Sequence, residues 1–139
     1  MDNGEIRIAS NGKWYYNGAE MFRIKIVNLF ATHLERDEQG NTFIHLGQEV
    51  FPVVVEDVPF YVIGVYETKP TLTLVFHDRQ EMEIVEPVRL TFKGDVPYLS
   101  FRWESDTKLS RGVYWRLSEY FEYREDGVYI VPPARAAQA

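Results

Sequence analysis

Two adjacent carboxylates stand in the most hydrophobic stretch of the chain. Glu56 and Asp57 interrupt the run EVFPVVVEDVPFYVIGVY, in which Val, Phe and Tyr predominate. Neighbouring residues on a regular strand point to opposite faces, so both acids reach one substrate only if a bulge before Pro59 re-aims them. In the alternative interpretation, Asp57 accepts backbone N–H bonds in a turn and Glu56 pairs with an arginine. Both acids are candidate ligand-binding residues, and a hydrolase that uses them is a further alternative.

Arginines beside aromatic rings form a second candidate binding site. They surround the expected start of the second helix: Arg102, Trp103, Arg111 and Trp115. A helix N-terminus with a nearby arginine can hold an anion, and an aromatic ring can stack on a base. In the alternative interpretation, these arginines pair with the 21 acidic residues of the chain and the rings fill the core. The pattern predicts a small anionic ligand.

Several kinds of chemistry lack their usual residues. The chain has no cysteine, so it has no thiol nucleophile and no zinc ribbon. His33, His45 and His77 do not stand at metal-ligand spacing, and no GxSxG elbow, Walker loop or GxGxxG turn is present. The net charge of −6 disfavours nucleic acid as a partner. The sequence therefore predicts no metal, no cofactor and no catalytic residue.

The length and the hydropathy pattern predict a cytoplasmic protein. The 139 residues match one compact unit. No apolar run is long enough to span a bilayer, and Met1 is followed by Asp-Asn-Gly-Glu, which is no secretory signal. We therefore expect no membrane partner.

Strands are predicted wherever alternating or β-branched runs are bounded by turn residues. Asn11-Gly12, between Ile6–Ile8 and Trp14–Tyr16, predicts a hairpin. The long apolar run should form two strands with a break near Asp57–Pro59, because proline cannot donate to a ladder. Further strands are expected at residues 42–46, 71–76, 82–85, 88–92, 98–103 and 128–131.

Two amphipathic helices are expected. The first begins near Glu20 and runs for roughly four turns, with an apolar stripe of Phe22, Ile26, Leu29, Phe30 and His33, widened by Val27 and Leu34. The second carries Leu109, Val113, Leu117 and Phe121 at a spacing of four. Ser105 and Asp106 are its N-cap candidates, although Gly112 favours a start at Ser110.

The order of the predicted elements repeats along the chain. Each half has an apolar-Arg-apolar strand, Ile6-Arg7-Ile8 or Val88-Arg89-Leu90, which is followed by a glycine turn, an aromatic strand, a helix, a charged turn and a further strand. This order predicts an α+β fold of two similar halves, each an antiparallel sheet with one amphipathic helix. The halves are residues 1–66 and 67–139, in one compact unit, with residues 134–139 as a frayed tail. In the alternative, a single α+β domain contains two helices that merely resemble each other.

Specific segments resemble the bacterial family known as domain of unknown function 1285. They are IRIASNGKWYYNG at the start, LFATHLERDEQG in the first helix, VEDVPF at Val55–Phe60 and LSRGVYWRLSEY at Leu109–Tyr120. The chain departs from the family at Leu46-Gly47-Gln48-Glu49, where the family reads Thr-Pro-Val-Glu. The resemblance implies two related α+β halves, the second superficially similar to a pleckstrin-homology roll. It also implies a ligand site between the halves, for a nucleotide-like molecule in signalling.

Together these features predict a non-catalytic module that binds a small anionic ligand. A protein–protein interaction or scaffold module is the alternative from a different class.

Overall fold

A computed structural model of the chain describes residues 4–133. The chain divides into two compact units, Met1–Pro59 and Phe60–Ala139. The division falls at Pro59 and not at the predicted Tyr66, because β7 (Phe60–Thr68) pairs with strands of the second unit. The predicted frayed tail, residues 134–139, lies outside the described residues. Within the described part, no helix is long and apolar enough to cross a membrane.

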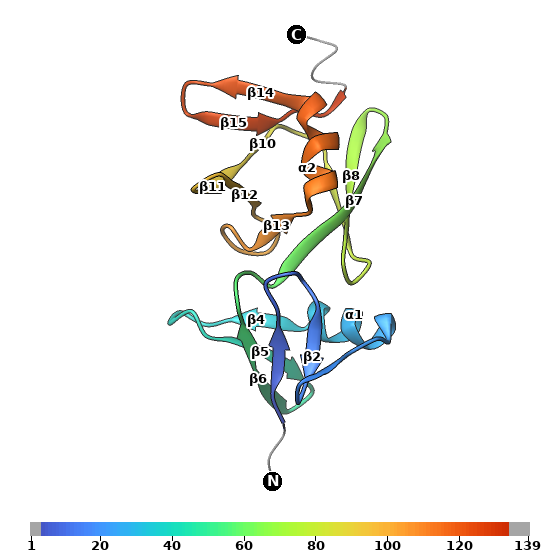
Figure 1. The fold of residues 1–139 in the computed structure, drawn as a ribbon, viewed down its shortest axis with the longest axis vertical. Coiled ribbons are helices and arrows are strands. Elements are labelled where there is room, and N and C mark those ends of the chain that lie inside the picture. The colour runs from blue at the N-terminus through green and yellow to red at the C-terminus, as the bar shows by residue number, and fades with distance from the viewer. Residues whose placement is uncertain (1–3, 134–139) are drawn as a thin grey trace. The chain divides into compact units, whose positions relative to one another are not determined.

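A six-stranded sheet in the order β3-β2-β1-β6-β5-β4 forms the N-terminal unit (Figure 1). Its strands are β1 (Ile6–Ile8), β2 (Trp14–Tyr16), β3 (Ala19–Glu20), β4 (Leu34–Arg36), β5 (Thr42–Leu46) and β6 (Glu49–Val55). β1 is antiparallel to β2 but parallel to β6. The prediction of an antiparallel sheet is wrong here. The segment between β1 and β6 contains α1, and a crossover of this length allows β1 and β6 to run parallel.

Two asparagine-glycine turns shape the start of this sheet. The predicted Asn11-Gly12 hairpin is confirmed, with Ile6 opposite Tyr16 and Gly12 at a φ of +91°. Asn17 and Gly18 both have positive φ, 50° and 84°, and connect β2 directly to β3. A two-residue turn with two positive φ angles matches the natural twist of a hairpin. The structure therefore has a short strand where the sequence predicted the beginning of a helix.

The first helix is shorter than predicted and buries a different face. α1 spans Ile24–Thr32, and its buried residues are Val27 and Ala31. Phe22, Ile26 and Leu29 of the predicted stripe are exposed. The helix has more apolar residues than one face can bury against the sheet, and Leu34 reaches the core from β4 instead.

The C-terminal unit contains two sheets. Their orders are β11-β12-β13-β7-β8-β9 and β10-β15-β14. The remaining strands are β8 (Thr71–Phe76), β9 (Glu81–Ile84), β10 (Val88–Arg89), β11 (Thr91–Lys93), β12 (Val96–Leu99), β13 (Thr107–Leu109), β14 (Phe121–Arg124) and β15 (Gly127–Ile130). The parallel pair β13–β7 makes the larger sheet mixed as well. The single strand predicted at residues 88–92 is wrong, because its two ends join different sheets and leave the buried Leu90 at the break.

The second helix is also shorter than predicted. α2 spans Arg111–Leu117, and the Ser110 side chain accepts the Val113 N–H as its N-cap. Asp106 is not the cap, because Thr107–Leu109 forms β13 between it and the helix. A 3₁₀ turn, η1 (Ser118–Tyr120), follows α2 and leads into β14, which takes Phe121 out of the predicted helix.

Two helices and three sheets make the described residues an α+β structure dominated by strands. Both units contain two antiparallel strand pairs, a helix and an antiparallel hairpin in the same order, β1-β2-β3-α1-β4-β5 and β11-β12-β13-α2-β14-β15. The break predicted inside the long apolar run is confirmed, because β6 ends at Val55 and β7 begins at Phe60.

Candidate functional site

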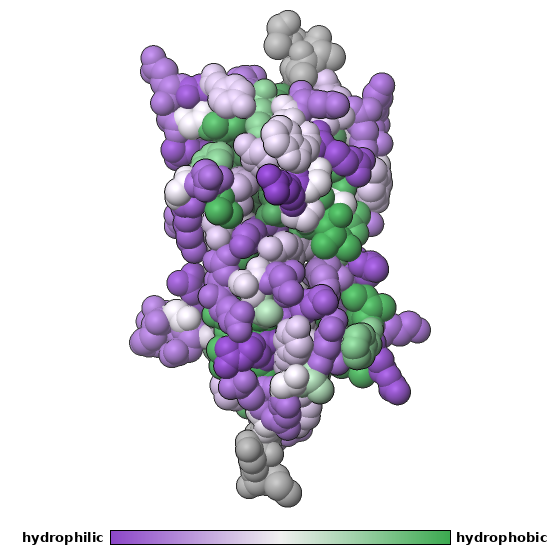
Figure 2. Space-filling model, in the orientation of Figure 1, coloured by the Kyte–Doolittle hydropathy of each residue, from purple (hydrophilic) through white to green (hydrophobic). Residues whose placement is uncertain are grey.

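A cavity of about 470 Å³ lies beside the start of α1 in the N-terminal unit. Its lining comes from β1, β2, β6, α1 and the segment before α1, and consists of Ile6, Tyr16, Met21, Phe22, Arg23, Ile26, Phe30 and Phe51. Hydrophobic surface is visible over α1 in Figure 2. The volume is typical of small-molecule pockets, which are mostly apolar with few polar groups.

The helix and the sheet position the apolar lining. Val27 and Ala31, four residues apart, face the core of the unit. Ile26 and Phe30, also four apart, occupy the neighbouring flank of the helix and line the cavity. Phe51 comes from β6, one of the central strands of the sheet. The cavity thus lies between a helix flank and a sheet that are both fixed by buried neighbours.

Arg23 is the only charged residue among the described residues of the cavity lining. It occupies the N-cap position of α1 with an extended backbone, and no side chain caps the helix there. Within residues 4–133, its guanidinium makes no ion pair or side-chain hydrogen bond. The first turn of α1 contains no acidic residue. A positive side chain and the positive end of the helix dipole therefore meet at one edge of an apolar cavity.

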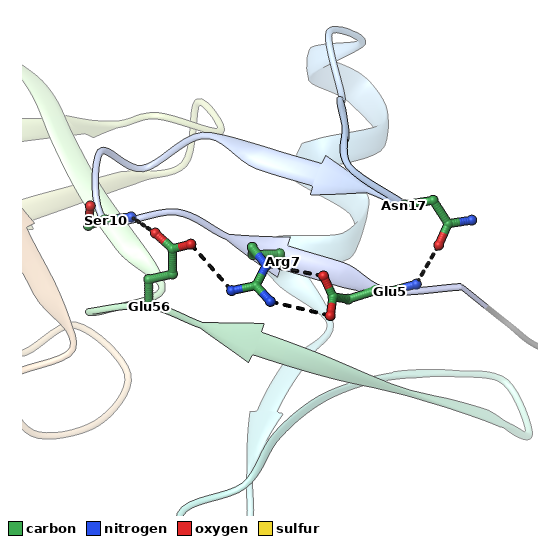
Figure 3. A network of polar contacts seen from close by, with 5 residues as sticks. All are labelled: Glu5, Arg7, Ser10, Asn17 and Glu56. Carbon is green, nitrogen blue, oxygen red and sulfur yellow. Dashed lines mark hydrogen bonds and ion pairs between the residues drawn. The ribbon is translucent and has the colours of Figure 1, made fainter.

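The predicted site residue Glu56 belongs to a polar network on β1 (Figure 3). Its carboxylate accepts the Ser10 N–H at 3.1 Å and pairs with Arg7 at 3.3 Å. Arg7 also pairs with Glu5 at 3.1 Å, and these two acids, Glu5 foremost, raise the pKa of Arg7 above its ordinary value. Asn17 completes the network by accepting the Glu5 N–H. Glu56 thus ties the end of β6 to the β1–β2 turn.

Asp57 follows Glu56 in the bend between β6 and β7 and is half-buried. Glu56 and Asp57 therefore lie in the connection and not on a strand. Neither residue lines the cavity beside α1.

Three of the four residues predicted around the second helix divide between two ring clusters of the C-terminal unit. Trp103 contacts Phe60, with the ring centres 5.7 Å apart, and Arg102 lies 5.8 Å above the same Phe60 ring. Trp115 instead makes a T-shaped contact with Tyr114, with the ring centres 5.9 Å apart, and is 64% exposed. Arg111 is the first residue of α2 and is exposed. None of these four residues lines any of the three cavities described for residues 4–133.

A buried carboxylate organises the segment before α2. Asp106 is 1% exposed and accepts the N–H groups of Phe101, Arg102 and Trp103 at 2.7–2.9 Å. It also accepts the Thr107 hydroxyl. The N–H groups near this helix start are thus directed to protein side chains, since Ser110 takes the Val113 N–H. The structure uses Asp106 to fix a loop.

Two further cavities have fewer features of a ligand site. One, of about 530 Å³, lies over β5 and β6 and is lined by Asp37, Asn41, Thr42, Phe43, Val50, Pro52 and Val53. The other, of about 120 Å³, lies beside α2, where the Tyr120 hydroxyl donates to Glu67 at 2.6 Å. That bond is the main cause of the raised pKa of Tyr120, about 12. The described residues contain no cluster of three or more potential metal ligands.

The sequence interpretation missed Met21, Phe22 and Arg23, because it placed them inside a helix that faces the core. The predicted apolar stripe of the first helix nevertheless indicated that some of its residues stay outside the core. Together with Val27 and Ala31, its apolar residues occupy more than one side of the helix. A helix with an apolar surface this broad leaves part of it outside a single packed interface.

Comparisons with known proteins find similarity to one family. Residues 1–58 match the model of the N-terminal domain of DUF1285, a domain of unknown function. A crystal structure of a DUF1285 family protein from Silicibacter pomeroyi DSS-3 is 26% identical, with a TM-score of 0.75, over 95% of this chain and 78% of that one. A second, from Shewanella baltica OS155, is 22% identical, with a TM-score of 0.73, over 88% of this chain and 96% of that one. No curated protein matches the chain.

Proposed function

We propose that this chain, which belongs to the DUF1285 family, is a non-catalytic binding module whose N-terminal unit takes up a small apolar ligand beside α1. The observation that carries the proposal is the cavity itself. It combines about 470 Å³ of space with an apolar and aromatic lining. Filling such a cavity removes apolar surface from water, which is the main favourable term in binding of this kind.

The lining supports binding more than catalysis. Of the eight described residues in the lining, seven are aliphatic, aromatic or sulfur-containing, and the eighth is Arg23. An acid–base or nucleophilic reaction needs a titratable group or a nucleophile against the reacting atom. An arginine that stays charged supplies neither, but it orients an anion well. Tyr16 is the one other titratable residue of the described lining, and no carboxylate or histidine accompanies it there.

Binding of a neutral apolar dye tests the proposal. Nile red should bind the full chain at a single site, with increased fluorescence. Ile26→Trp places a larger ring in the cavity and should weaken this binding at least tenfold. Leu29→Trp is the matched control, because Leu29 lies on the same helix, is similarly exposed and does not line the cavity. Equal binding by both variants, with helical circular dichroism unchanged, would refute the proposal.

The nucleotide-like ligand implied by the family resemblance stays a prediction. A thermal-shift screen of nucleotides against the full chain tests it, and Arg102→Ala and Arg111→Ala are the variants that should abolish a true effect. The apolar ligand is preferred here because the described lining of the cavity beside α1 has one cation and one hydroxyl, that of Tyr16, among otherwise apolar side chains.

A protein partner is the second candidate function. Phe22, at the rim of the cavity, is 82% exposed, and exposed aromatic residues are enriched at recognition surfaces. If Phe22→Ala removes a partner recovered by pull-down and leaves Nile red binding unchanged, this second function replaces the first.

We also propose that the two units arose by duplication. The shared order of strand pairs, helix and hairpin supports this origin. Superposition of residues 4–55 on residues 91–130 tests it, because unrelated units would not align α1 with α2 and the flanking strands in register. The similarity of the second unit to a pleckstrin-homology roll stays a prediction that the same comparison would test.

A further inference from the structure

We propose that the ligand of the α1 cavity is a carboxylate amphiphile, with its tail among the aromatic residues and its carboxylate on Arg23. This inference rests on the proposed binding function and adds the chemical class of the ligand. Carboxylate and guanidinium match in shape and can form two parallel hydrogen bonds.

The position of Arg23 favours an anion at one edge of the cavity. Among the described residues, no acid neutralises its side chain, and the residues that flank it in the lining are Phe22 and Ile26. The next basic residue, Lys25, lies in the first turn of α1 but does not line the cavity. A charged head at Arg23 therefore has a single well-placed partner.

The remainder of the cavity favours an apolar tail. Phe30 and Phe51 come from the helix and the sheet, and Met21 adds a flexible side chain that adapts to irregular shapes. A tail that enters between them buries additional methylene groups against these apolar side chains. Each buried methylene should tighten binding about fourfold until the cavity is full.

The charge balance favours one negative charge over several. The chain has a net charge of −6, which repels polyanions in general. Phosphate-rich ligands are held by several cations or by a row of backbone N–H groups. The cavity lining provides one guanidinium. A ligand with one carboxylate therefore matches the single guanidinium of the lining.

The test compares two probes of equal chain length, decanoate and 1-decanol, by calorimetry with the full chain. Both are used below the concentration at which they aggregate. Decanoate should bind about tenfold more tightly than 1-decanol, consistent with a charged hydrogen bond. Arg23→Gln should abolish this preference and leave 1-decanol binding unchanged. Lys25→Gln is the matched control and should preserve the preference.

The outcomes separate this inference from the proposed function. If both probes bind equally and Arg23→Gln has no effect, the cavity binds apolar ligands but the carboxylate class is wrong. If neither probe binds, both proposals fail. Binding only to vesicles or micelles, and not to dispersed decanoate, would identify a lipid surface as the partner and overturn the inference. A series from hexanoate to dodecanoate should show affinity rising with length, and a flat series would also contradict it.

Discussion

The helices of the two units occupy corresponding places in the order of elements, but their surroundings differ. At the start of α1 stands Arg23, with no side-chain cap, an exposed Phe22 before it and a cavity beside it. At the start of α2, Ser110 caps the helix and the buried Asp106 fixes the preceding loop. The start of α2 is thus held by side-chain hydrogen bonds, whereas the start of α1 leaves apolar surface and a positive charge exposed, as the proposed binding function requires.

The largest effect is expected when the Asp106 carboxylate before α2 is removed. Asp106→Ala leaves three backbone N–H groups and one hydroxyl without their acceptor. We expect a loss of about 3 kcal/mol or more and a fall in Tm of roughly 10 °C. Thermal unfolding followed by circular dichroism measures this. Asp95→Ala, at an exposed turn, is the control and should change Tm little. An unchanged Tm for Asp106→Ala would mean that the loop does not depend on this carboxylate.

The second test concerns which face of α1 is packed. Val27→Ala removes two methyl groups from a residue that is 1% exposed and should cost about 2 kcal/mol. Leu29→Ala, on the exposed face, should change the free energy of unfolding by less than about 0.5 kcal/mol. Urea denaturation of both variants gives the comparison. A larger loss of stability for Leu29→Ala than for Val27→Ala would show that the side of the helix with Leu29 is packed, as the sequence predicts.

This helix also shows how far the sequence could determine the structure. The hairpin at Asn11-Gly12 and the break before Phe60 were predictable, because turn residues and prolines act locally. Asn17-Gly18 carried the same kind of signal, and its strand β3 was nevertheless missed. Local propensity could not show which apolar side of α1 packs, because that choice depends on the position of the sheet.

The candidate sites show the same limit. The pairing of Glu56 with an arginine was foreseen as an alternative, and its partner is Arg7. The separation of Trp103 from Trp115 into two ring clusters was not predictable, because it follows from the position of β13 between Trp103 and α2. The cavity beside α1 was missed for a related reason, because it is formed by residues from β1, β6 and α1 that are distant in sequence.

A smaller effect is expected from the network at the end of β6. Glu56→Ala removes the acceptor of the Ser10 N–H and one partner of Arg7. Because the network is exposed, we expect a loss of about 0.5–1 kcal/mol, measured by urea denaturation. Binding of Nile red should not change. A loss of binding would connect this network to the ligand site and contradict their assignment to separate roles.

The smallest expected effect is a dependence of stability on high pH in the C-terminal unit. The pKa of Tyr120 is raised from 10.0 to about 12, mainly by its bond to Glu67. The stability from the protonated hydroxyl is therefore fully present below pH 10 and is lost as the pH rises through about 12. The difference in unfolding free energy between the wild type and Tyr120→Phe should decrease over this range. A difference that is constant from pH 9 to 12 would show that the bond does not form.

The most direct measurement of the central claim is a titration of the methyl-labelled full chain with decanoate, followed by NMR. Perturbations should concentrate on the methyl groups of Ile6, Met21 and Ile26, which line the cavity, and should saturate at one ligand per chain. Methyl groups of Val113 and Leu117, buried on α2, should stay unchanged. Perturbations centred on α2, or none at all up to the aggregation limit of decanoate, would contradict the assignment of the binding site to α1.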